Sequence, residues 1–568
     1  MSTFVIFFIM GKFRYIFFLY FILCVTFVQA QKPAALPKYE YRAVWVTTIE
    51  NLDWPRTQIK KPSDVAVQQR ELIVLLDSLK TLNVNCVMLQ TRVRGDVLYP
   101  SKIEPFSKVL TGVSGRDPGY DPLAFAIEEC HKRGMQLHAW VVTLPLGDIK
   151  HVASHRGKAL NKLFPQLCRV YNGKWYMEAG EPATADYLAR LAEEMVSNYE
   201  LDGIHLDYIR YPDKPSKYPD GYLFRKYGAG LSRADWRRAN ITRIMREVYN
   251  KVKNVKPWVR VSCAPLGKND DLTAYSSRGY NAVRTVYQEP QRWLREGIVD
   301  AIFPMIYFSG NDFYPFMRDW EENSCGRHIV PGIGAYRLLP EYGDWEPLEV
   351  GRQLVTSRSS GTDGTIMFRL RHLLDNIKGF YYIYRSIYAT PSLVPPMTWC
   401  GKEAPDAPKN FSGVRVGDTL HLKWDRVEPV DGMPALYYNL YASDKPVDIT
   451  SPRNFMGVML HDNRYSWVGS KLATMYWALT AVDAYGIESE VVRWEEPGHE
   501  QQLFRDEFLL PKPAVWGMRI VLKDAVGAVL YNGKYRTRVG VRGLPPGCYM
   551  LEILSRDGAV LDRLPFVR

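Results

Sequence analysis

Short runs of β-branched and apolar residues alternate with longer amphipathic segments from Arg42 to about Tyr388. This rhythm is typical of βα units, in which each helix returns the chain to the start of the next parallel strand. Eight segments have the composition of strands: 43–48, 86–92, 136–142, 203–210, 260–266, 301–308, 329–335 and 365–370. Eight such units predict an α/β fold of the (β/α)8 TIM-barrel type, with enlarged loops.

The segments between these strands support the barrel. Amphipathic helices are expected over 63–82, 122–133, 184–199 and 235–253. The main alternative is an open doubly wound sheet, which commonly binds a nucleotide at a glycine-rich turn after its first strand. No glycine-rich fingerprint follows Thr48, so the sequence favours the barrel and predicts no cofactor.

The pattern becomes all-β after Pro395 and Pro396. Alternation at 420–424, 437–441 and 476–483 resembles that of a fibronectin type III sandwich, which we expect over 405–493. A small β domain is expected over 510–568, resembling either a C-terminal sorting domain of Gram-negative bacteria or a plain accessory sandwich. The predicted organisation is therefore a barrel over 31–395 followed by one or two small all-β sandwich domains.

The first thirty residues have the features of a signal peptide. Lys12 and Arg14 precede an apolar run from Tyr15 to Val28, and cleavage is expected after Ala30. We therefore expect an exported protein of a Gram-negative bacterium, in the periplasm, at the cell surface or outside the cell, with no stable membrane span after cleavage. A retained membrane helix is the alternative, because the apolar stretch is long for a signal core.

Composition excludes two other classes of function. The formal net charge of +12 could indicate a nucleic-acid partner, but Lys and Arg are scattered and no nucleic-acid-binding motif is present. Seven of the eight cysteines would remain after cleavage, widely spaced and without a disulfide framework. Cys86, Cys130 and Cys263 lie in apolar patterns and are expected to be small buried hydrophobic residues.

The segment D-G-I-H-L-D-Y-I-R-Y-P, residues 202–212, contains the strongest candidate for catalysis. Because side chains alternate along a strand, Ile204 and Leu206 should pack against helices while His205 and Asp207 face the barrel interior. Active sites of such barrels form at the C-terminal ends of the strands. Asp207 is therefore predicted at the mouth, and a structural ion pair with Arg210 is the alternative.

Polar residues also end the neighbouring strands and should meet Asp207 at the same end of the barrel. The set predicted to bind substrate is Gln90, Arg92, His138, Trp140, His205, Arg210, Tyr307 and Asp270. Asp96 follows the second strand, beside Gly95, and is a catalytic candidate or a turn residue. Each aromatic and histidine in this set has a structural alternative as a core residue.

Several longer motifs give a family resemblance. They are R-A-V-W-V-T-T at 42–48, D-W-P at 53–55, Q-T-R-V-R-G-D-V-L-Y-P-S at 90–101, D-P-L-A-F-A-I-E-E-C-H-K-R-G at 121–134, H-A-W at 138–140, the segment 202–212 and A-P-L-G at 264–267. With these motifs the chain resembles the glycosyl hydrolase-like 10 family of exported bacterial proteins. The resemblance implies a glycoside hydrolase barrel with a carbohydrate substrate, often followed by a fibronectin-like domain.

Two departures from that family bear on the chemistry. Its members often carry two adjacent acids where this chain has Asp207 and Tyr208, so the second acid does not carry over. Many members follow H-A-W with an Asn-Pro-x-Arg loop, whereas this chain continues with V-V-T-L-P at 141–145. The third loop is therefore expected to shape a different substrate site.

Glycoside hydrolysis ordinarily uses two carboxyl groups, one as acid and one as nucleophile or base. We expect Asp207 to be the nucleophile or base, kept ionised by Arg92, Arg210 and His205. Asp96 is the expected acid, with Asp270 and Asp271 as alternatives.

Three functions follow from the sequence. The first is an exported glycoside hydrolase acting on a polysaccharide or oligosaccharide. The second is a carbohydrate-binding barrel without catalysis, which the missing tandem acid favours. The third is a metal-dependent hydrolase in which His138, His205 and Asp207 hold a divalent ion, although the usual metal-binding spacings are absent from these positions.

Overall fold

A computed structural model describes residues 36–567 except 276–278, 401–402, 417–418, 430–432, 435, 469–474, 496–506, 510–516, 525–526, 542 and 546–547. The predicted signal peptide lies outside the described residues. Among the residues described, no helix is both long and apolar enough to cross a bilayer.

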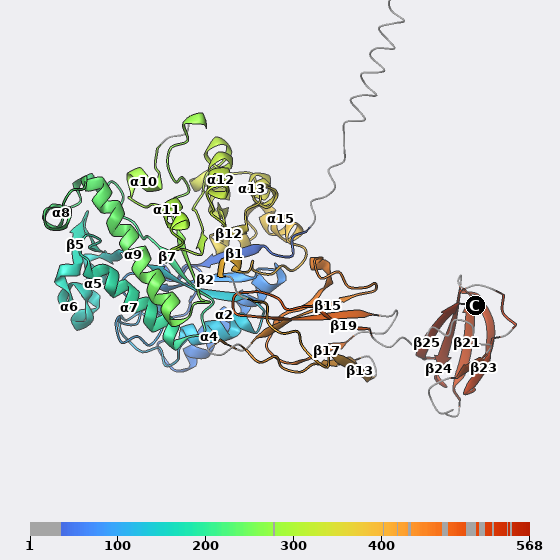
Figure 1. The fold of residues 1–568 in the computed structure, drawn as a ribbon. Helices are drawn as coiled ribbons and strands as arrows, with labels where there is room; N and C mark the ends of the chain where they lie inside the picture. Colours follow the sequence, from blue (N-terminus) through green and yellow to red (C-terminus); the bar gives the residue numbers. More distant parts are fainter. Residues whose placement is uncertain are drawn as a thin grey trace, which may run out of the picture.

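The first part of the chain is a parallel barrel (Figure 1). Its strands are β1 (Tyr41–Val46), β2 (Cys86–Arg92), β3 (Gln136–Val142), β7 (Gly203–Asp207), β8 (Arg260–Ala264), β9 (Ala301–Ile302), β10 (His328–Ile329), β11 (Gly332–Gly334) and β12 (Gly364–Phe368). Each pairs in parallel with its neighbours, and β1 pairs with both β2 and β12. β10 pairs with β9 and β11 pairs with β12, so these two segments act as one strand that closes the ring. The predicted (β/α)8 barrel is confirmed.

Both faces of the strands are buried, as a barrel inside a ring of helices requires. Ile204 and Leu206 belong to the core shared with the helices, whereas His205 faces inward and contacts Trp45 and Phe303 with ring centroids 5.9 and 5.2 Å apart. The predicted alternation along β7 is therefore confirmed.

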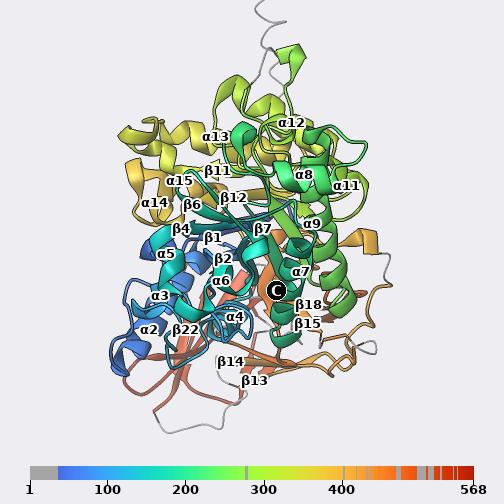
Figure 2. The ribbon, with the colours of Figure 1, turned by 90° about the vertical axis from the view of Figure 1, so that its left-hand side faces the viewer.

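The helices surround the strands (Figure 2). They include α2 (Ser63–Thr81), α4 (Pro122–His131), α7 (Ala183–Asn198), α9 (Arg233–Val255), α11 (Pro290–Arg295), α12 (Tyr314–Glu322), α13 (Pro347–Ser359) and α15 (Phe380–Ile387). Further helices are α3 (Lys108–Thr111), α5 (Ile149–Ser154), α6 (Leu160–Leu163), α8 (Gly221–Tyr227), α10 (Ala282–Thr285) and α14 (Leu370–Leu374). The connection from β3 to β7 also holds a small sheet of β4 (Pro145–Asp148), β6 (Lys174–Met177) and β5 (Cys168–Tyr171).

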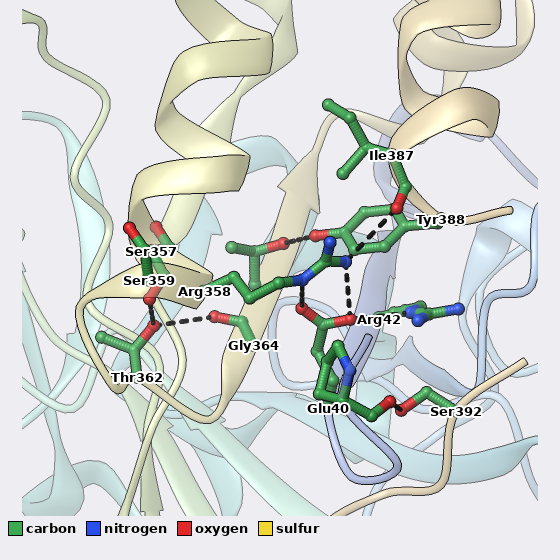
Figure 3. A network of polar contacts seen from close by, with 12 residues as sticks. Glu40, Arg42, Ser357, Arg358, Ser359, Thr362, Gly364, Ile387, Tyr388 and Ser392 are labelled. Carbon is green, nitrogen blue, oxygen red and sulfur yellow. Dashed lines mark hydrogen bonds and ion pairs between the residues drawn. The ribbon is translucent and has the colours of Figure 1, made fainter. Parts of the chain in front are cut away.

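A buried ion network lies where the chain enters β1, at the N-terminal end of the barrel (Figure 3). The Glu40 carboxylate accepts hydrogen bonds from Nε of Arg42 at 3.0 Å and from Nε and Nη2 of Arg358 at 2.7 and 2.9 Å. Both guanidinium groups lie over the ring of Tyr388, at 4.8 and 5.2 Å. The Tyr388 hydroxyl is 2.8 Å from Oγ1 of Thr365 on β12. The network therefore ties β1, β12, α13 and the end of α15 together.

Two β sheets follow the barrel. One contains β13 (Ser412–Val416), β14 (Thr419–Lys423) and β17 (Arg464–Val468), and the other contains β15 (Tyr437–Ser443), β16 (Phe455–Leu460), β18 (Tyr476–Val482) and β19 (Val492–Glu495). Side chains from both sheets share one apolar core. The pair contacts the N-terminal end of the barrel, where the Tyr39 hydroxyl donates to Glu488 at 2.7 Å and the Met397 N–H donates to the Tyr485 carbonyl at 2.9 Å. The opposite, C-terminal end of the barrel therefore does not face this module.

The last segment is also all-β. Its strands are β20 (Glu507–Leu509), β21 (Arg519–Asp524), β22 (Val529–Lys534), β23 (Arg538–Gly540), β24 (Cys548–Leu554) and β25 (Val560–Val567). β22, β21, β24 and β25 form one antiparallel sheet with its own apolar cluster, and β20 pairs with β23. The expected change from a barrel to small all-β modules is thus confirmed.

Candidate active site

Asp207 is the last residue of β7 and lies at the C-terminal end of the barrel, 4% exposed. Its Oδ2 accepts a hydrogen bond from the indole N–H of Trp140 at 3.1 Å, and its Oδ1 accepts one from the backbone N–H of Tyr208 at 2.6 Å. Burial raises the pKa of Asp207 to about 6, against the lowering effect of these two hydrogen bonds and of the Arg210 charge. The carboxyl can therefore exchange a proton near neutral pH.

Of the three side chains expected to keep Asp207 ionised, Arg210 alone is among the groups that lower its pKa, and it does not outweigh burial. Arg92 is fully buried and binds Glu104 through two hydrogen bonds of 2.8 and 2.7 Å. Arg210 donates to Asp213 at 2.8 Å rather than pairing with Asp207. Burial holds the pKa of His205 well below its usual value, so that ring is neutral. Desolvation consequently dominates the titration of Asp207.

His205 is an oriented core histidine. The Trp45 N–H donates to its Nε2 at 3.0 Å, so the ring proton is on Nδ1, which lies 2.9 Å from Oγ of Ser262.

His138 is fully buried beneath Gly203, and burial lowers its pKa to about 3. A Cβ atom at position 203 would lie only 2.5 Å from Nδ1 of His138, so glycine is required there. Since both nitrogens of His205 are occupied, the predicted metal set of His138, His205 and Asp207 is not formed.

Two other predicted binding residues support loops. Oε1 of Gln90 accepts the backbone N–H groups of Thr48 at 3.0 Å and Ile49 at 2.8 Å, which fixes the loop after β1. Besides binding Glu104, Arg92 donates to the Thr143 carbonyl at 2.6 Å and so joins the loops after β2 and β3. Both side chains are buried and hold the backbone of loops at the C-terminal end of the barrel, so neither is placed to contact substrate directly.

The predicted second carboxylates lie in different surroundings. Asp96 is fully buried in the loop after β2, with Oδ2 3.7 Å from Nε2 of both His151 and His155. Asp270, in the loop after β8, is half-buried and pairs with Arg284, while Asp271 accepts a hydrogen bond from Asn281 at 3.0 Å. In the described part of the chain, none of the three is among the groups that shift the pKa of Asp207.

A row of aromatic rings extends from the partner of Asp207 toward solvent. Trp140 lies 6.4 Å from Trp45, Trp45 lies 6.5 Å from Tyr307, and Tyr307 lies 5.6 Å from Tyr336. Tyr336 contacts the exposed ring of Tyr342 at 5.4 Å. Sequence reasoning found Trp140 and Tyr307 but missed the other three rings. Tyr336 directly follows Ala335, where the seventh strand was predicted to end. Its position after a strand could therefore have identified it as a candidate site residue.

The loop after β7 places a polar group beside this row. Tyr208 adopts a positive φ of 51°, which ends β7 at Asp207 and leaves its ring 43% exposed. Arg210 lies over that ring at 4.7 Å and donates to the hydroxyl of Tyr280 at 3.0 Å. Tyr280 also donates to Asp213. The sequence predicted Arg210 here but missed Tyr280 and Asp213, which no motif distinguished.

Trp140→Phe tests the role of the indole N–H. The variant keeps the aromatic ring but removes the hydrogen bond to ionised Asp207, so the pKa of Asp207 should rise above about 6. We expect kcat/KM of the reaction that uses Asp207 to fall by about tenfold, the size of one charge-assisted hydrogen bond. The limb of the pH profile that depends on Asp207 should move to higher pH. Trp45→Phe is the matched control, because its N–H binds His205, and an equal displacement of that limb would contradict the assignment.

Comparison with known proteins assigns the part of the chain that contains this site to a family. The sequence profile of the glycosyl hydrolase-like 10 family matches residues 40–326, which include Asp207 and Trp140. The glycosyl hydrolase YngK of Bacillus subtilis is 32% identical over 430 residues, which cover 71% of this chain and 83% of that protein. The glycosyl hydrolase DigH of Escherichia coli is 35% identical over 297 residues, 49% of this chain and 66% of that protein.

Solved structures give more distant similarities. The glycoside hydrolase domain of PgaB from Bordetella bronchiseptica aligns with 62% of this chain and 99% of its own length, at 14% identity and a TM-score of 0.41. The α-L-fucosidase isoenzyme 2 of Paenibacillus thiaminolyticus aligns with 62% of this chain and 49% of its own length, at 17% identity and a TM-score of 0.40. The family assignment depends on the sequence matches alone.

Proposed function

Because this chain belongs to the glycosyl hydrolase-like 10 family, we propose that it is an exported enzyme that hydrolyses O-glycosidic bonds in a polysaccharide or oligosaccharide. One observation carries the proposal. A carboxyl group whose pKa is raised to about 6 lies at the C-terminal end of a barrel strand, at the head of a row of aromatic rings. Trp140 and Trp45 are buried, whereas Tyr342 at the outer end of the row is 49% exposed and offers an apolar surface against which a sugar ring can pack.

Asp207 fits the role of proton donor better than the expected role of nucleophile. A glycosidase acid must hold its proton near the working pH and deliver it to the leaving oxygen, and burial of a carboxyl group in an apolar site achieves this. The pKa of about 6 satisfies that requirement, whereas a nucleophile must be ionised. We infer that Asp207 protonates the glycosidic oxygen.

Asp213 is our choice for the second carboxylate. Burial raises its pKa, but the Tyr280 hydrogen bond and the Arg210 charge outweigh burial and lower the pKa below its usual value. Two carboxyl groups with pKa values displaced in opposite directions mark an acid and its ionised partner. Asp213 lies in the loop that follows Asp207, and its side chain is 67% exposed. Asp96 is fully buried and is therefore ranked behind Asp213, and Asp270, which pairs with Arg284 as Asp213 pairs with Arg210, is the alternative.

A pH profile combined with Asp213→Asn tests the assignment. If protonated Asp207 is required, kcat/KM should fall about tenfold per pH unit above about 6, because the donor loses its proton there. Asp213→Asn should lower kcat by roughly 10²-fold or more and remove the acidic limb, while leaving the limb near 6 in place. Asp270→Asn is the control and should change neither limb. Product release from candidate polysaccharides would be measured as new reducing ends. If activity instead rises as the pH increases through 6, Asp207 acts in its ionised form, as nucleophile or base, and the assignment as proton donor is wrong.

The second candidate function is carbohydrate binding without cleavage. Tyr208 favours it, because an exposed aromatic ring stands where relatives often carry a second acid. Polysaccharide binding by the wild-type protein without new reducing ends at any pH would support this function and exclude the hydrolase.

Two finer assignments extend the proposal. We assign the β13–β19 module to the fibronectin type III type, which its division into sheets of three and four strands supports. Export is supported by the apolar N-terminal segment, and N-terminal sequencing of the mature protein should begin at Gln31.

A further inference from the structure

A buried cluster of one carboxylate and two imidazoles lies outside the set assigned to hydrolysis. Asp96 comes from the loop after β2, and His151 and His155 come from α5 and the residue that caps it. One ligand atom of each residue lies within 4.8 Å of the others. Among the residues described, this is the one group of histidine, cysteine and acidic side chains with such spacing.

Polar atoms in this cluster have no hydrogen-bond partner although they are shielded from solvent. They are Oδ2 of Asp96, Nδ1 of His151 and Nε2 of His155. Their residues are 0, 7 and 6% exposed. Because an unpaired carboxylate oxygen in the interior is costly, Oδ2 of Asp96 requires a binding partner. The unpaired Nε2 of His155 and the Nε2 of His151 both lie 3.7 Å from that oxygen.

The distances fit a divalent metal ion. Two ligands that each lie about 2.0–2.1 Å from zinc at a tetrahedral angle are about 3.3 Å apart. Oδ2 of Asp96 lies 3.7 Å from both Nε2 atoms, so these two distances are within a few tenths of an ångström of that value, and the ligand atoms of the two histidines lie within 4.8 Å of each other. The carbonyl oxygen of Arg94 is 3.2 Å from Nε2 of His151, which suits either a hydrogen bond or a fourth ligand.

Local structure holds the three side chains in place. The Asp148 side chain accepts the His151 N–H at 2.7 Å and caps α5, and the spacing of four residues puts both imidazoles on one face. Gly147 has a φ of 98°, and a Cβ atom there would lie 2.8 Å from the His151 ring. The Arg94 N–H donates to Oδ1 of Asp96 at 3.2 Å, which leaves Oδ2 directed at the histidines.

We propose that Asp96, His151 and His155 bind a divalent transition-metal ion of the zinc class, which joins the loop after β2 to the long connection between β3 and β7. Imidazole nitrogens with one carboxylate oxygen form a donor set that such ions prefer. The connection begins at Thr143, whose N–H and hydroxyl both donate to the Asp207 carbonyl at 2.9 Å. The ion would therefore hold the segment that supports the backbone of Asp207, without contacting substrate.

The test is metal binding by the full mature chain, produced without a histidine tag and stripped with a chelator. Titration with Zn²⁺, and with Co²⁺ as a spectroscopic probe, should show one tight site and a cobalt spectrum without an intense thiolate charge-transfer band. Asp96→Asn and His155→Gln should each weaken that site by at least tenfold, since loss of a supporting residue alone costs 10–100-fold. Zn²⁺ should raise the melting temperature of the wild type but not of the variants.

His421→Gln is the control, because this exposed histidine on β14 lies outside the cluster. It should leave the tight site unchanged. Equal Zn²⁺ affinity in the wild type and the folded Asp96→Asn variant would overturn the proposal, as would a thiolate band. Binding is measured without substrate, so the result is independent of whether the barrel hydrolyses glycosides.

Discussion

Asp207→Asn is expected to lower kcat on a glycoside substrate by about a thousandfold, within the range lost when a general acid is removed. Asn keeps the shape of the side chain but has no proton to deliver. Its single oxygen can accept one of the two hydrogen bonds that Trp140 and the Tyr208 N–H donate to the separate carboxylate oxygens, and the Tyr208 bond at 2.6 Å is the shorter of the two. Substrate affinity should be retained, because the aromatic row is unchanged. Initial rates of reducing-end release and the affinity for uncleaved polymer would both be measured.

Asp363→Asn is the matched control. Burial also raises the pKa of Asp363 to about 6, but this residue precedes β12 at the opposite end of the barrel and accepts the Ile329 N–H at 2.8 Å. The two carboxyl groups therefore share their electrostatics and differ in position. Wild-type turnover in Asp363→Asn together with loss in Asp207→Asn would assign the effect to the active site, whereas equal loss in both would refute the assignment.

Stability gives an independent check that Asp207→Asn is folded. A carboxyl group whose pKa is higher in the folded chain stabilises the fold fully below the unfolded value, and this contribution is lost as pH rises through the folded value. The difference between about 6 and 3.8 corresponds to about 3 kcal/mol at most. Asp207→Asn should therefore raise the free energy of unfolding at pH 8 and have little effect near pH 4. The stability of the variant relative to the wild type should therefore increase from pH 4 to pH 8, and a difference that is the same at both pH values would contradict the raised pKa.

The barrel could be predicted because its signal is periodic and local. All eight predicted strands are present, but several end earlier than predicted: β7 stops at Asp207 because Tyr208 has a positive φ, and β9 stops before Phe303 and Pro304. The apolar sequence continues past both points, so hydrophobicity alone could not locate the ends. These are the positions at which the chain leaves the sheet to form the mouth.

The site was less predictable than the fold because ion pairs depend on tertiary neighbours. Arg92 has the strand position of a binding residue, yet Glu104, twelve residues later, returns to neutralise it. Asp207 and Trp140 were both selected from their strand positions, but the hydrogen bond between them required the register of β3 against β7. The spacing of His151 and His155 was visible in the sequence, although α5 is too short to give an amphipathic pattern.

Glu40→Gln should have the largest effect on stability, about 3 kcal/mol or more in the free energy of unfolding. The substitution preserves shape but removes the one negative charge that contacts both Arg42 and Arg358, so two guanidinium groups are left at the buried base of the barrel without a counter-charge. Because these residues join β1 to α13, the loss should appear in the denaturant midpoint of the barrel transition, followed by tryptophan fluorescence.

Glu322→Gln provides the comparison for Glu40→Gln. Glu322 pairs with Arg318 along α12, and both side chains are more than half exposed, so the same chemical change should alter stability by about 0.5 kcal/mol or less. The contrast depends on desolvation, since Arg42 is fully buried and Arg358 is only 15% exposed, so little water can replace the lost carboxylate. Equal effects of the two substitutions would mean that the Glu40 network is solvated and does not close the barrel. Turnover of Glu40→Gln below its unfolding transition should match the wild type, because the network lies at the end of the barrel opposite Asp207.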